Sequence, residues 1–239
     1  MVTDGIANVL LAFIAISAAL AAISGLVVLQ GFFHNKLKEL FNDVNYFIFF
    51  FLVFGYFLYA LGELSFYLAE IAFQDQSIIG IHDIYWSSGG ILILISFIAL
   101  AKLLFREQHS GGKVTTFLIT GAMIVGFVLA AVFGLIGSES QYFFGYFYPI
   151  ISSLIVTASL SVVLFYNQLG GFKEVLLLFF LASGGILLGD VFFHYSTTWG
   201  VYGAIGLTAD IFYLIGYTLS FAAFVTMRMK MKTLAFIKK

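Results

Sequence analysis

The chain has 239 residues, of which 62% are hydrophobic and only 10% carry a charge, and its formal net charge is −1 at pH 7. A water-soluble domain could not bury so much apolar surface, so the composition excludes one and indicates a protein whose main solvent is lipid. The absence of cysteine excludes disulfides and thiolate metal sites. Nucleic-acid binding has no support, because the 11 Lys and Arg residues are scattered over loops.

Seven apolar stretches follow one another, each long enough for a helix to cross a bilayer. The first has no basic segment or cleavage site typical of a removable signal, so we interpret it as a span. A loop is predicted at 197–202, and a short basic tail after residue 227. The sequence thus predicts an all-α, polytopic protein in a single transmembrane domain over residues 1–239. The predicted helices lie at 5–33, 44–73, 82–105, 114–136, 142–166, 172–196 and 203–227.

The basic residues predict the orientation of this seven-helix arrangement. Every Lys and Arg falls on one side of it, in the loops or helix ends around residues 34–39, 102–113 and 173, and after residue 227. By the positive-inside rule, the N-terminus is then outside and the C-terminus cytoplasmic. The opposite loops carry acids only, among them Asp75 and Glu139, which favours cations near the outer face.

One acidic motif occurs twice in the chain. The run LGELSFY, which begins at Leu61, is matched 127 residues later by LGDVFFH, which begins at Leu188. At the same offset, the run DIYW from Asp83 is matched by DIFY from Asp210. Each copy therefore places two carboxylates within otherwise apolar segments.

A weaker match between the first and fifth predicted helices extends this duplication. It predicts two parallel three-helix repeats, at 5–105 and 142–228, joined by a linker helix at 113–136. In layout the chain resembles the SWEET and PQ-loop transporters and the microbial rhodopsins, which also have seven helices. The Pro-Gln dipeptide of PQ-loop proteins is absent, and Leu214 stands where the resemblance would place the retinal lysine, so no retinal is expected.

The duplicated acids need compensation if they lie in the membrane, because an ionised carboxylate near the bilayer centre costs roughly 2.5–3.5 kcal/mol. No Lys or Arg occurs near the middle of a predicted span to neutralise them. Protonation, water access or a bound cation would compensate, and a cation is the simplest of these. Repeats that face each other would bring the acids to one depth in the outer half of the membrane. The predicted cation ligands are Glu63, Asp83, Asp190, His194 and Asp210.

Three more residues extend the predicted site. Tyr67 and Glu70 follow Glu63 at helical spacings, so the three share one helix face. Asp190 and His194 have the spacing of Glu63 and Tyr67, and His82 precedes Asp83. The additional predicted site residues are thus Glu70, His82 and Tyr67. Such oxygen and imidazole donors suit zinc, manganese, calcium or magnesium.

A second interpretation of the acids needs no bound ion. Asp83 and Glu70 are then solvated helix ends, while the deeper acids are protonated and hydrogen-bonded to neighbouring hydroxyls. Trp86 and Trp199 are predicted as anchors at the membrane interface. The predicted hydroxyl partners of the deeper acids are Tyr59, Tyr85, Ser87 and Tyr213.

Three functions are compatible with this pattern. The leading hypothesis is an integral membrane transporter or exchanger for a divalent cation or a proton-coupled solute. The second is a zinc-dependent hydrolase acting on lipid, by resemblance to ceramidases and adiponectin-receptor-like proteins, although this chain has too few membrane histidines for three imidazole ligands. The third is a sensor or a subunit of a membrane complex. An enzyme is the less favoured reading, and the expected partners are the bilayer, a small cation or solute, and a second copy or another membrane subunit.

Overall fold

The computed structural model describes residues 2–32, 40–73, 80–107, 121, 143–166 and 172–237. The predicted linker at 113–136 therefore lies, apart from Gly121, outside the described residues. Within the described ranges the chain forms helices and short turns, which confirms the all-α class. The elements are α1 (Val2–Phe32), α2 (Val44–Tyr67), the π-helical turn η2 (Leu68–Phe73), α3 (Ile81–Glu107), α5 (Phe143–Phe165), α6 (Lys173–Trp199) and α7 (Tyr202–Ile237).

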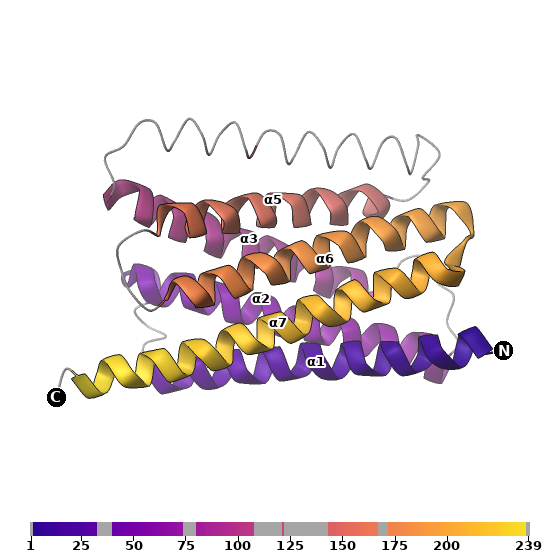
Figure 1. Cartoon of the computed structure of the whole chain (residues 1–239), viewed down its shortest axis with the longest axis horizontal. Coiled ribbons are helices and arrows are strands. Elements are labelled where there is room, and N and C mark those ends of the chain that lie inside the picture. Colours follow the sequence, from indigo (N-terminus) through magenta and orange to yellow (C-terminus); the bar gives the residue numbers. More distant parts are fainter. Residues whose placement is uncertain are drawn as a thin grey trace.

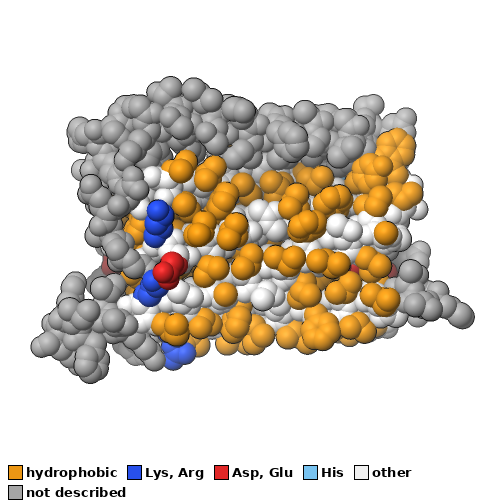
Figure 2. Space-filling view, viewed as in Figure 1, with side chains coloured by type: hydrophobic (Ala, Val, Ile, Leu, Met, Phe, Trp, Pro, Cys, Tyr) orange, Lys and Arg blue, Asp and Glu red, His pale blue; other side chains and the backbone are white. Residues whose placement is uncertain are grey.

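Six of the described helices are long and apolar enough to cross a bilayer, with candidate spans of 21–29 residues. Their outer faces support this assignment, because large apolar side chains stay exposed along them. Figure 2 shows one such face, which is covered by hydrophobic side chains over most of its length. The protein is therefore an integral, multi-pass membrane protein in contact with lipid. On α1 the exposed stripe repeats every three or four residues, at Ile6, Val9, Phe13, Ile16, Leu20 and Ile23.

The described helices form a ring that follows chain order. α1 packs on α2, α2 on α3, α3 on α5, α5 on α6 and α6 on α7, and α7 closes the ring against α1 (Figure 1). The last turns of α2 and α6 meet the first turns of α3, α5 and α7 at one end of this ring. α3, α5 and α7 therefore run in one direction, and α2 and α6 run in the other.

Basic residues gather at the opposite end of the bundle. Within the described ranges, every Lys and Arg lies in the last turns of α3 and α7 or the first turn of α6. Figure 2 shows Lys and Arg side chains at the left end of the visible face. At the basic end, Lys230 forms a surface ion pair of 2.7 Å with Glu174. The charge asymmetry expected from the sequence is therefore present between the two ends of the described helices.

Several helix ends extend beyond their predicted limits, and two of these extensions replace a predicted loop or tail. α6 continues through Trp199, so the loop predicted at 197–202 begins only at Gly200. α7 continues to Ile237, so the predicted basic tail is largely helical. Neither extension contains a glycine or proline, and nothing in it stops the helix. Gly200 ends α6 with a left-handed φ of 62°, while the Val201 N–H donates to the Ser196 carbonyl at 3.0 Å.

Gly200→Ala is expected to destabilise the protein by about 1–2 kcal/mol, because a Cβ is disfavoured in the left-handed region. Thermal unfolding in detergent should show the loss as a lower Tm. Gly200→Asn is the matched control, since asparagine tolerates this conformation, and it should lose clearly less. Equal losses in both variants would mean that the left-handed backbone is not the cause.

Glycines allow the helices to approach closely in two places. A Cβ on Gly55 of α2 would lie 2.9 Å from the carbonyl oxygen of Gly89 on α3, and the reverse contact would be 2.8 Å. On α6 and α7, a Cβ on Gly216 would lie 3.1 Å from the carbonyl oxygen of Ala182. Small residues at these crossings therefore set the spacing of both helix pairs.

Aromatic rings fill the middle of the ring of helices. Tyr56, Phe97, Phe179 and Phe224 come from four different helices, and each is at most 1% exposed. Phe179 lies 5.0 Å from Phe224, 5.9 Å from Tyr56 and 6.2 Å from Phe97, measured between ring centroids. We call these four residues the aromatic plug. It separates the basic end of the bundle from the end that holds the acids.

Candidate functional site

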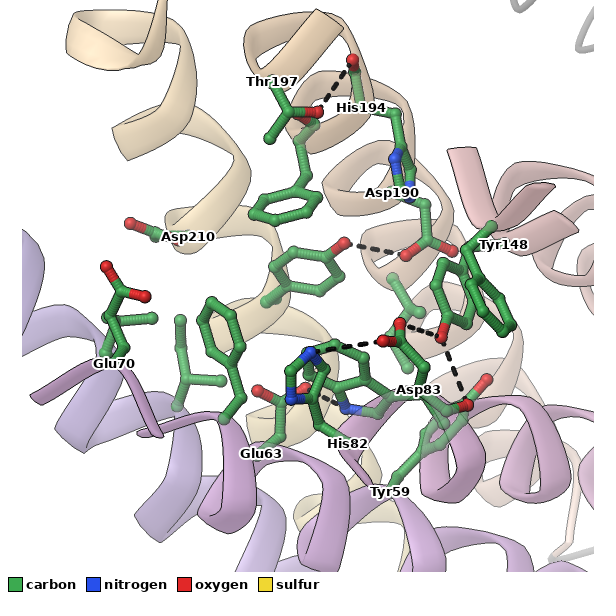
Figure 3. Close-up of a pocket in the computed structure, with 18 of the residues that line it drawn as sticks. Tyr59, Glu63, Glu70, His82, Asp83, Tyr148, Asp190, His194, Thr197 and Asp210 are labelled. Atoms are coloured by element: carbon green, nitrogen blue, oxygen red, sulfur yellow. Dashed lines mark hydrogen bonds and ion pairs between the residues drawn. The ribbon is translucent and has the colours of Figure 1, made fainter. Parts of the chain in front are cut away.

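The ring of helices encloses a cavity of about 450 Å³ at the end opposite the basic residues. All five predicted ligands line it, and so do Glu70 and His82 (Figure 3). Residues separated by more than a hundred positions are thus brought to one space. Aromatic residues make up most of the remaining wall, namely Tyr59, Phe66, Trp86, Phe144, Tyr148, Phe193, Tyr213 and Tyr217.

Tyr67 does not belong to this cavity. It lines a separate apolar groove between α1 and α2, together with Leu64 and Ile16. A residue four positions after Glu63 sits about 40° further around the helix, which here turns Tyr67 toward α1. The α-helix also ends at Tyr67, and the wider π-helical turn η2 follows and carries Glu70 to the cavity. The structure therefore places Tyr67 outside the cavity that the other predicted site residues line.

Glu63 lies deep in the cavity on the last part of α2 and is 7% exposed. Its Oε1 accepts hydrogen bonds from Trp86 Nε1 at 3.1 Å and from the Tyr217 hydroxyl at 2.6 Å. Its other oxygen, Oε2, accepts no hydrogen bond from the described residues. Glu63 therefore joins α2 to α3 and α7 through one oxygen, and the second remains available to a ligand.

Asp190 occupies the matching position on α6 and is also 7% exposed. Its Oδ1 accepts from the Tyr213 hydroxyl at 2.8 Å, and its Oδ2 accepts from the Ser152 hydroxyl. Tyr213 was among the expected hydroxyl partners, whereas Ser152 on α5 was not. Both carboxylate oxygens of Asp190 are thus engaged, unlike those of Glu63.

The helix pairs α2–α3 and α6–α7 each contain a hydrogen bond between an acid and an aromatic side chain, at equivalent positions. Trp86 follows Glu63 by 23 residues, and Tyr213 follows Asp190 by the same interval. In each pair, the glycine just before the acid lies against that aromatic ring: a Cβ on Gly62 would overlap Trp86. A Cβ on Gly189 would lie 2.7 Å from Tyr213. The local geometry of α2–α3 and α6–α7 is therefore closely similar at these positions.

Asp83 lies in the first turn of α3 and is buried, at 5% exposed. Its Oδ2 accepts from the Gly80 N–H at 2.8 Å and lies 3.4 Å from His82 Nε2. Its Oδ1 accepts from the Tyr148 hydroxyl on α5 at 2.7 Å. Asp83 is thus not a solvated helix end: it accepts the N–H of the residue that precedes α3, as the acid of a capping box does, and it links α3 to α5.

His194 lines the cavity from α6 without a hydrogen bond to a neighbouring described residue. It is 8% exposed, and its ring stacks on Tyr148 with centroids 5.7 Å apart. Its ring nitrogens form no hydrogen bond or ion pair with the residues that the structure describes. A buried imidazole without such partners is costly, so a group within the cavity is expected to complete its hydrogen bonding.

Asp210 and Glu70 complete the acidic lining. Asp210, in the first turns of α7, is 2% exposed, whereas Glu70 on η2 is exposed. Figure 3 shows both carboxylates on the same side of the cavity, away from the pair formed by Asp83 and Tyr148. Glu70 thus marks the rim of the cavity, and Asp210 lies within it.

Sequence reasoning missed four residues that hold the acids. Trp86 was predicted as an interfacial anchor but instead turns inward, because Glu63 accepts its indole N–H. Tyr217 had a detectable signal, since it follows Asp210 and Tyr213 at helical spacing. Ser152 and Tyr148 had little, because nothing local shows which face of α5 meets α6. Trp199 is 51% exposed near the end of α6, as expected of an anchor.

A metal ion does not fit these side chains as they lie. Within the described residues, no three His, Asp or Glu side chains approach closely enough to hold one ion. The acids are instead spread around a wide space, and two of them use both oxygens for bonds to protein donors. The predicted zinc, manganese, calcium or magnesium site therefore stays a prediction that would require the acids to move together.

The cavity end of the bundle also differs from the basic end in charge. No Lys or Arg occurs among the described residues that line the cavity, while it holds five carboxylic acids. Such a space favours positive charge and disfavours anions.

Compared with protein-family models, curated proteins and solved structures, the chain matches none of them.

Proposed function

We propose that this protein is a membrane transporter or exchanger that binds a positively charged solute in the acidic cavity. The observation that carries this proposal is the convergence of Glu63, Glu70, Asp83, Asp190 and Asp210 on one cavity within a ring of apolar helices. Acids in such a place are expensive and are typical of ion, proton and substrate pathways. A cation or protons would compensate their charge.

The shape of the bundle supports transport by alternating access. The cavity reaches the end of the bundle where Glu70 and Thr197 are exposed, while the aromatic plug closes the other half. Glu63 lies seven residues from Tyr56, or about 10 Å along the helix, so the acids sit directly above the plug. A rocking motion that opens the plug and closes the cavity would carry a bound solute across.

The duplicated geometry supports two parallel repeats as the moving units. The matched hydrogen bonds of Glu63 and Asp190, and the matched close approaches at Gly89 and Gly216, make α2–α3 and α6–α7 comparable bodies. A seventh helix, the linker predicted at 113–136, is part of the proposed arrangement. By the positive-inside rule the cavity end faces outside, and the C-terminus is cytoplasmic.

The test is flux through purified protein in liposomes that contain a pH-sensitive dye. Addition of a cationic solute outside should drive its uptake and move protons in the opposite direction. Empty liposomes are the first control. The second is Glu174→Gln, which removes an exposed acid at the basic end, far from the cavity, and should leave uptake unchanged.

Other outcomes separate the competing functions. Release of fatty acid from a lipid substrate without flux would favour the membrane hydrolase. Cation binding without flux or hydrolysis would favour a sensor or a complex subunit. Absence of both binding and flux for every cation would overturn the proposal.

A further inference from the structure

The geometry points to a small organic ammonium ion as the ligand of the cavity, held by Glu63 and His194 between aromatic walls. This inference rests on the proposed function and names the class of its solute. It differs from the predicted divalent metal in size, in the number of ligands it requires and in the nature of the surfaces that contact it.

The size of the cavity is the first argument. Its volume of about 450 Å³ lies within the range of roughly 300–1,000 Å³ that is usual for sites of small organic molecules. A dehydrated metal ion would leave most of this space empty or filled with water. It also needs several oxygen ligands around one point, and the described residues provide no such group of three.

The second argument is which polar atoms still lack a partner. Asp83 and Asp190 use both carboxylate oxygens for hydrogen bonds to protein donors, whereas Glu63 uses only Oε1. His194 is buried and its ring nitrogens bond to no described residue. Among these buried side chains, Glu63 Oε2 and the His194 imidazole are thus available to a ligand, and they suit an ammonium group and a second polar group of the same molecule.

The third argument is the wall of the cavity. Trp86 packs 5.4 Å from Phe66 and 6.0 Å, edge to face, from Tyr148, so these rings hold one another in place. Tyr59 and Tyr217 pack edge to face at 6.3 Å beside Glu63. Rigid aromatic faces next to a carboxylate are the surroundings in which proteins bind alkylammonium ions, through cation–π attraction in a water-poor space. A strongly hydrated metal ion gains little from such walls.

The experiment compares choline with its uncharged isostere 3,3-dimethylbutan-1-ol, and both with Mn²⁺ and Zn²⁺, on the full-length protein in detergent. Thermal unfolding and titration calorimetry report binding. Choline and butylammonium should raise Tm, and the uncharged isostere should bind at least about tenfold more weakly. Glu63→Gln and His194→Phe should each weaken choline binding by about tenfold or more, while Glu174→Gln should not change it.

The possible results distinguish a failure of this inference from a failure of the proposed function. Binding of Mn²⁺ or Zn²⁺ through Glu63, without binding of either ammonium ion, would overturn the organic ligand but keep a cation site. Equal binding of choline and its isostere would overturn it too, because the charge would then be irrelevant. Binding of none of the cations would overturn both. Circular dichroism of each variant shows whether a loss of binding is a loss of fold.

Discussion

Glu63→Gln is expected to lower cation uptake in liposomes by about 10- to 100-fold with little change in thermal stability. Trp86 and Tyr217 both donate to Oε1, and the glutamine carbonyl oxygen can take that place and keep both bonds. The change is thus confined to Oε2, where an acceptor with negative charge becomes an uncharged donor. A hydrogen bond to a charged group contributes about 1.5–3 kcal/mol, which corresponds to this fold-change.

Asp190→Asn is the informative companion to this variant. Both oxygens of Asp190 accept hydroxyl hydrogens, so the new amide NH₂ must face Ser152 or Tyr213, and that hydroxyl must turn to accept. We expect a smaller loss of uptake than for Glu63→Gln, because each oxygen of Asp190 already accepts a hydroxyl hydrogen, whereas Glu63 Oε2 accepts none from the described residues. Uptake rates at several solute concentrations measure both variants. A larger effect at Asp190 would contradict the assignment of Glu63 as the main counter-ion.

Gly55→Ala is expected to destabilise the bundle by about 1–3 kcal/mol, the usual range for an overpacked interior. The new Cβ would lie 2.9 Å from the Gly89 carbonyl oxygen and 3.1 Å from the backbone nitrogen of Ile93. Backbone atoms cannot rotate away as side chains can, so α2 and α3 must separate. This would also shift Glu63 relative to Trp86, so reduced uptake should accompany the lower Tm.

Gly184→Ala provides the matched control for this prediction. Gly184 also lies within a membrane helix, but a Cβ there meets no atom within 4 Å. Because alanine favours the helix more than glycine does, its stability should be unchanged or slightly increased. Comparable losses of stability in the two variants would mean that close helix approach at Gly55 is not the cause.

The hydrogen bonds around the acids indicate that the two interpretations drawn from the sequence apply to different acids. One held that the acids bind a cation, and the other that they are bonded to neighbouring hydroxyls. Asp190 and Asp83 follow the second, since Tyr213, Ser152 and Tyr148 occupy their oxygens. Glu63 has features of both, because one oxygen is structural and the other faces no protein donor. The acids thus divide into positioning groups and a group available for binding.

Hydropathy and the duplicated motif alone determined the membrane class, the positions of the described membrane-spanning helices and the set of acids that line the cavity. Hydropathy over 20 residues reports directly on burial in lipid, and the 127-residue duplication placed Glu63 and Asp190 at matching depths. Only the tertiary structure decided that Trp86 turns inward, that Tyr67 turns toward α1, and that Tyr217 reaches Glu63 from 154 positions away. Helical spacing defines which residues share a face, but the rotation of each helix about its axis is set by packing against its neighbours. In this bundle, that packing depends on close contacts such as Gly55 with Gly89, whose partners are distant in sequence.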